Sequence, residues 1–215
     1  MRLLILMLLF VNAYKGFYVV QGSKKLNVKS GIGVPCLCQP GMSFSEISKN
    51  IGDDALFCDS ERGTTTVAKS QWGMEFSYNP EFDGDLVRTL LFHVRPVKYA
   101  DVFMENRSAI FLEDRDLFRG VVDGDLDFAN GNVSLFDVVE KYGDSDVVFQ
   151  QGEFFKDIDG LASYKILDVN GNVLAITYQD RGISFIFENN HVDDFVIFMP
   201  AQNNGAFFSS MFFVR

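Results

Sequence analysis

The sequence predicts a mixed α+β fold made of two tandem units, each a short capped helix packed on an antiparallel sheet. Two pairs of matching segments indicate this. "MSFSEISKNIGDD" (42–54) resembles "VSLFDVVEKYGDS" (133–145), and "GMEFSYN" (73–79) resembles "GISFIFE" (182–188). Because both matches come in the same order, we expect a duplication with the helices on one sheet face and the other face open.

The first pair of segments predicts two helices of about three turns. Ser43 and Ser134 stand where an N-cap would, and an acid follows three residues later, Glu46 or Asp137. This spacing is typical of a capping box, in which the hydroxyl and the carboxylate each bond a backbone N–H. Apolar residues then recur at helical spacing, and a glycine ends each run.

The second pair of segments predicts strands. Residues 73–79 and 182–188 alternate in polarity, and the segments 87–94 and 192–199 follow as the next strands. Asn170-Gly171 is a strong hairpin signal between two strand-like runs. The offset between the matched segments grows from 91 to 109 residues, which predicts a longer loop in the second unit, at about 147–161.

The organisation along the chain follows from these units. The predicted order is a signal peptide over 1–13, an N-terminal segment over 14–39, unit one over 40–95, a linker over 96–130, unit two over 131–200, and an aromatic closing strand or tail over 201–215.

The segment "MRLLILMLLFVNA" predicts export. One positive charge precedes an apolar run, and Val11-x-Ala13 resembles a small-residue cleavage site. The run has about half the length of a membrane-spanning helix. No cysteine directly follows it, so we expect no lipid anchor and a secreted or periplasmic protein. The alternative is a buried N-terminal element of a cytosolic domain.

The charge balance indicates the class of partner. The chain has 29 acidic and 19 basic residues, a net charge of −10. This balance argues against binding to nucleic acid or to an anionic membrane, because both require lysine and arginine. It favours a protein partner with a basic surface.

The three cysteines lie in the first third of the chain. Cysteines two residues apart rarely bridge each other, so an exported chain is expected to pair Cys58 with Cys36 or Cys38.

Asp123, Asp125 and Asp127 alternate as in a calcium loop, but Phe128 stands where an EF-hand requires glycine. These aspartates are an incomplete calcium candidate, and no cofactor is expected.

No catalytic arrangement is evident. The two histidines, His93 and His191, have no nucleophile motif around them. We therefore predict that the chain is not an enzyme. The alternatives are a module that binds a small ligand or calcium, and an unrecognised enzyme that uses cysteine or paired acids.

The open sheet face is the predicted site for a protein partner. It mixes apolar, aromatic and acidic groups, which suits protein recognition. Its predicted members are Trp72, Glu75, Ser77, His93, Ser184, Ile186 and Glu188.

One family resemblance supports this interpretation. Gly41-Met42-Ser43-x-x-Glu46-Ile47, closed by Gly52 and followed by a sheet, resembles the repeat of beta-lactamase inhibitor proteins. It is also similar to the repeat of small outer-membrane assembly lipoproteins. The resemblance implies a two-unit sheet in secreted or envelope proteins that bind other proteins, of an inhibitor, immunity or assembly kind. The matched residues are structural in that family, so no functional residue carries over.

Overall fold

The computed structural model describes residues 26–51, 56–59, 65–69, 72–78, 86–95, 117–151, 158 and 160–200. This part of the chain has a mixed α+β fold with two helices and two sheets. Its elements are β1 (Asn27–Val28), α2 (Phe44–Ile51), β2 (Leu56–Asp59), β3 (Thr65–Lys69), β4 (Met74–Tyr78), β5 (Thr89–His93), β6 (Val121–Val122), β7 (Leu126–Asp127), α4 (Leu135–Tyr142), β8 (Val148–Gln150), β9 (Ser163–Leu167), β10 (Val173–Tyr178), β11 (Ile183–Glu188) and β12 (His191–Phe198).

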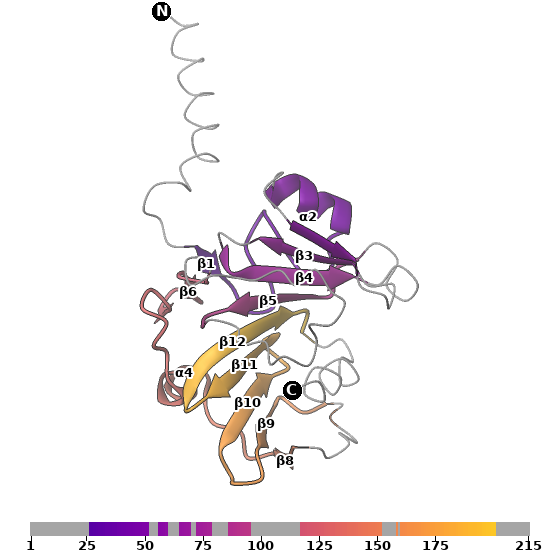
Figure 1. Cartoon of the computed structure of the whole chain (residues 1–215). Coiled ribbons are helices and arrows are strands. Elements are labelled where there is room, and N and C mark those ends of the chain that lie inside the picture. Colours follow the sequence, from indigo (N-terminus) through magenta and orange to yellow (C-terminus); the bar gives the residue numbers. More distant parts are fainter. Residues whose placement is uncertain are drawn as a thin grey trace, which may run out of the picture.

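The larger sheet has nine strands in the order β2-β3-β4-β5-β12-β11-β10-β9-β8. Neighbouring strands are antiparallel except β8 and β9, which are parallel. The strands turn progressively from β3 to β9, as the right-handed twist of strands requires (Figure 1). The pairing of β5 with β12 joins the early and late halves of the chain into one sheet.

The smaller sheet has the order β1-β6-β7, with β1 parallel to β6 and β6 antiparallel to β7. It lies on the same side of the large sheet as the helices, because Val28 and Val122 belong to the same core as Ile47 and Val138. Residues 117–130 were predicted to be linker, and the structure places two strands there. The segment is short and rich in turns, so its strand signal is slight.

Both predicted capping boxes are present. In α4 the Ser134 hydroxyl accepts from the Asp137 N–H, and the Asp137 carboxylate accepts from the Ser134 N–H at 2.7 Å. In α2 the Glu46 N–H donates to Ser43 Oγ at 3.2 Å, and the Ser43 N–H donates to Glu46 at 3.0 Å. Gly143 ends α4 with φ 89°, a conformation in which a side chain would be strained.

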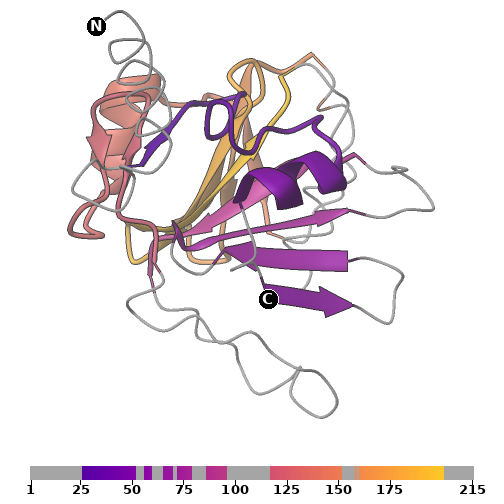
Figure 2. The same ribbon diagram turned by 90° about the horizontal axis from the view of Figure 1, so that it is seen from above.

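Figure 2 views α2 and α4 from above, at separate places along the large sheet. The core between the helices and the sheet is aromatic at its centre. Phe92 of β5 stacks on Phe195 of β12 with ring centroids 4.8 Å apart, and Phe118 packs edge-on against both. Val138 and Tyr142 of α4 are buried against this core. The apolar stripe of each helix is therefore what attaches it to the sheet.

Several strand predictions are confirmed. The Asn170-Gly171 turn connects β9 and β10, with Gly171 at φ 84°. Residues 73–79 and 182–188 contain β4 and β11, and the segments that follow contain β5 and β12. The segment predicted to be a loop, at about 147–161, contains a strand, because Val148–Gln150 forms β8. The expected signal peptide at 1–13 and the segment 201–215 lie outside the described residues. Neither described helix has the length and apolar content needed to cross a membrane.

Ser134→Ala and Ser43→Ala should each lower the free energy of unfolding by about 1 kcal/mol, because each removes a side-chain acceptor from a helix N-terminus. Urea denaturation checks this. Lys49→Ala, on the exposed side of α2, is the control and should change stability by less than about 0.5 kcal/mol. Equal midpoints for all variants would show that the caps contribute nothing.

Candidate functional site

The sheet face opposite the helices carries a row of buried polar side chains. The strand registers place His93 opposite Asp194 and Thr177 opposite Ser184, all on this face. Thr89 lies on the same face, two residues before Leu91 in β5. We call Thr89, His93, Asp194, Ser184 and Thr177 the polar row.

The polar row is held by internal hydrogen bonds. His93 Nδ1 lies 2.9 Å from Asp194 Oδ1, across the pairing of β5 with β12, and both side chains are only 3% exposed. Thr177 Oγ1 and Ser184 Oγ are 2.9 Å apart, and the Ser184 hydroxyl also approaches the Ile176 carbonyl at 3.4 Å. Buried polar groups are stable when they are bonded in this way. The row therefore ties neighbouring strands together.

The prediction of an open sheet face is wrong over the described strands β5, β12 and β11. His93, Ser184 and Ile186 are all buried, Ser184 completely. Ile186 packs with Val196 and Phe198 in a cluster of its own on this face. Ser184 and Glu188 made this row of β11 look solvated in the sequence, although a serine can be buried when its hydroxyl is hydrogen-bonded, as Ser184 is to Thr177.

The remaining predicted partner-binding residues are Trp72, Glu75, Ser77 and Glu188. Trp72 is half-buried and packs against the helix-side core, so it lies on the opposite face. Glu75 and Ser77 occupy register positions opposite Leu91 and Thr89, and only their register is described. Glu188, the last residue of β11, is exposed.

One feature of the sequence indicates the polar row. The segment that became β12, "HVDDFVIF", places Asp194 inside an apolar run, and an acid in a buried strand is almost always paired. Consecutive apolar residues in β11 and β12 are typical of strands covered on both faces.

The predicted disulfide is absent. Cys36 is an exposed free thiol and Cys38 a buried free thiol. Cys38 Sγ contacts Met74 Sδ at 3.3 Å, and Met74 belongs to the helix-side core. Cys58 lies in β2 at the register position opposite Thr66 of β3. Burial raises the pKa of the Cys38 thiol to about 12, which is unsuitable for a nucleophile.

The candidate calcium aspartates form separate contacts. Asp123 accepts from the Ser30 N–H at 2.9 Å, from the Ser30 hydroxyl and from the Tyr142 hydroxyl at 2.7 Å. Partial burial opposes ionisation of Asp123, but the hydrogen bonds from Ser30 and Tyr142 and the charge of Lys141 keep its pKa below the usual range. Asp125 pairs with Lys141.

Asp127, the third candidate, accepts from the Ala129 N–H at 2.8 Å. Among the described residues, no three His, Cys, Asp or Glu side chains are grouped so that they could hold a metal. Asp123, between β6 and β7, connects these strands to α4 and to the turn after β1.

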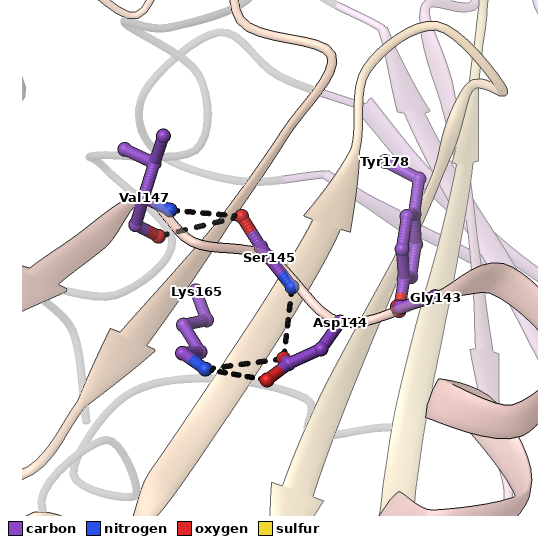
Figure 3. Close-up of polar contacts among 6 residues, drawn as sticks. All are labelled: Gly143, Asp144, Ser145, Val147, Lys165 and Tyr178. Atoms are coloured by element: carbon purple, nitrogen blue, oxygen red, sulfur yellow. Dashed lines mark hydrogen bonds and ion pairs between the residues drawn. The ribbon is translucent and has the colours of Figure 1, made fainter.

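A second polar cluster fixes the end of α4 (Figure 3). The Tyr178 hydroxyl donates to the Gly143 carbonyl at 2.6 Å, and Lys165 Nζ lies 2.8 Å from Asp144 Oδ2. The hydrogen bond from Lys165 lowers the pKa of Asp144, although slight burial opposes it. Ser145 donates its N–H to Asp144 and bonds Val147 through its hydroxyl. These contacts attach the helix to β9 and β10.

Comparison of the chain with models of known families, with curated proteins and with solved structures gives no match. Function therefore has to be argued from the surface of this chain and from its internal geometry.

The cysteines provide a direct test of the described arrangement. Iodoacetamide at pH 8 should alkylate Cys36 in the folded protein and should reach Cys38 only after denaturation, because Cys38 is buried with a raised pKa. Tandem mass spectrometry assigns the label to each residue. Equal labelling of both thiols in the folded state would contradict the burial of Cys38.

The His93–Asp194 pair provides a second test. His93→Phe and Asp194→Thr should each lower the free energy of unfolding by about 3 kcal/mol, because each deprives a buried polar group of its hydrogen bond. The double variant should lose less free energy of unfolding than the sum of the two single losses. It places a phenylalanine opposite a threonine, and Thr89 already lies opposite Phe198 between the same two strands. Strict additivity in urea denaturation would show that the pair is not coupled.

Proposed function

We propose that this chain is an exported protein-binding module, secreted or periplasmic, made of two related helix-plus-sheet units and acting by contact rather than by catalysis. The resemblance to inhibitor and envelope-assembly repeats favours an inhibitor, immunity or assembly role. The proposal depends most on the net charge of −10, and the relation between the two units supports it.

Equivalent hydrogen bonds support the relation between the units. The Val87 N–H donates to the Met42 carbonyl at 3.0 Å, and the Val192 N–H donates to the Val133 carbonyl at 2.9 Å. Met42 and Val133 are the residues matched by the two helix segments. Val87 lies two residues before β5, and Val192 is the second residue of β12. The same contact thus connects the start of the helix to the last strand in both halves.

The central strand pairing also supports this relation. When Val87 is aligned with Val192, Asp194 is the counterpart of Thr89, and Phe198 is the counterpart of His93. The register joins Thr89 to Phe198 and His93 to Asp194. The two pairs therefore join corresponding positions of the two strands. This is expected for two similar units arranged about an approximate two-fold axis.

The charge of the outer surface favours a basic protein as the partner. The chain carries a net charge of −10. Lys141 and Lys165 are engaged in ion pairs with Asp125 and Asp144, so they do not offer free positive charge to a ligand. A negatively charged surface accelerates association with a positively charged partner and repels anionic ones.

Isolation of the chain from its native compartment, followed by reconstitution, tests this proposal. We expect a protein partner that can be purified separately and that binds the chain in surface plasmon resonance. The association rate should fall as salt is raised, because salt screens the attraction between opposite charges. A second acidic protein of similar size serves as the control. A chain that binds no protein, or a rate that does not depend on salt, would contradict the proposal.

A further inference from the structure

We propose that the outward face of α4, formed by Phe136, Asp137 and Glu140, is the docking surface for a basic segment of the partner protein. This inference rests on the proposed function and assigns it to one surface. We call these three residues the α4 face.

Phe136 is the aromatic anchor of the α4 face. Its side chain is 71% exposed, whereas Val138 and Tyr142 on the other side of the same helix are buried in the core. A large exposed aromatic side chain contributes little to folding, because its apolar area stays in water. At an interface the same side chain would be buried, and aromatic residues are the commonest anchors there.

The comparison of α4 with α2 shows that packing does not require this anchor. Both helices have eight residues, the same capping box and two buried apolar residues on the inner side. At the outward positions matched by the sequence, α2 has Ser45 and Lys49 where α4 has Phe136 and Glu140. A helix that performs the same packing role therefore does without the exposed aromatic residue and carries the opposite charge.

Charge identifies the occupant of the α4 face. Residues 120–151 contain seven acidic residues and one basic residue, Lys141, which is paired with Asp125. The exposed Glu140 lies one helical turn after Phe136, on the same side of the helix. A segment rich in lysine or arginine with an apolar recess for Phe136 complements this arrangement. A second copy of this chain would present the same negative charge and would be repelled.

The α4 face is held rigidly at both ends of the helix. At its start the Leu135 N–H donates to the Asn190 carbonyl at 2.8 Å, in addition to the Ser134 cap. At its end Tyr178 holds the Gly143 carbonyl. A helix fixed in this way loses little conformational freedom on binding, which favours affinity. Figure 1 shows α4 at the side of the molecule, away from α2.

Site-specific photo-crosslinking in the full chain tests the proposal. A benzoylphenylalanine is introduced at position 136, and in a matched variant at position 45 of α2, in cells that naturally produce the protein. We expect a crosslink from position 136 to a lysine- or arginine-rich segment of one protein, and none to that segment from position 45. Crosslinks of equal yield from both positions, to a non-basic segment, or to a second copy would overturn the proposal.

Binding measurements with the purified crosslinked partner complete the test. Phe136→Ser with Glu140→Lys, which introduces the α2 residues, should weaken affinity by at least about 30-fold and leave the thermal unfolding midpoint unchanged. Ser45→Ala with Lys49→Ala should leave affinity unchanged. If the partner binds both variants equally well, the α4 face is wrong while the proposed function stands. If no partner binds the unaltered chain, the proposed function itself fails.

Discussion

The antiparallel pairing of β5 with β12 is the contact on which the rest of the described structure depends. Each of these strands is the last of its antiparallel run, and their pairing makes two four-stranded runs into one sheet. The helices are positioned relative to the same strands. Ser43 forms a bridge with Leu86, just before β5, and Ser134 forms a bridge with His191, at the start of β12. Loss of the central pairing would therefore separate both halves of the core and both helix starts.

This central position explains the polar row. Strands in the middle of a sheet that is covered on both faces cannot expose their polar side chains, so each such group needs a partner within the protein. His93 bonds Asp194 and Thr177 bonds Ser184 for this reason. At the other end of the same pairing, Thr89 lies opposite Phe198, without two ionisable groups. The pairing of β5 with β12 therefore does not require two ionisable groups at both ends, and the His93–Asp194 pair is particular to one end of it.

The sequence allowed the local features to be predicted, and long-range burial was missed. The caps at Ser43 and Ser134 and the Asn170-Gly171 hairpin depend on a few neighbouring residues, and all three are confirmed. The burial of Ser184 depends on what lies over the sheet, which strand alternation does not report. β8 was missed because it is three residues long and pairs in parallel with a strand that comes later in the chain. Phe136 lies outside the buried apolar stripe of Val138 and Tyr142, so the helical pattern predicts no role for it.

The packing of the sheet also limits which positions can change without loss of stability. Side chains packed on both faces of β11 and β12 have little room to change, because cores are close-packed and resist changes in volume. The outward positions of the helices have no such constraint, since exposed substitutions usually alter stability by less than about 0.5 kcal/mol. A helix can therefore keep its cap and its inner apolar residues while its outward residues change. The change from Ser45 and Lys49 in one helix to Phe136 and Glu140 in the other is of this kind. Recognition through the α4 face, as proposed, would then depend on the helix surface, with the sheet as its support.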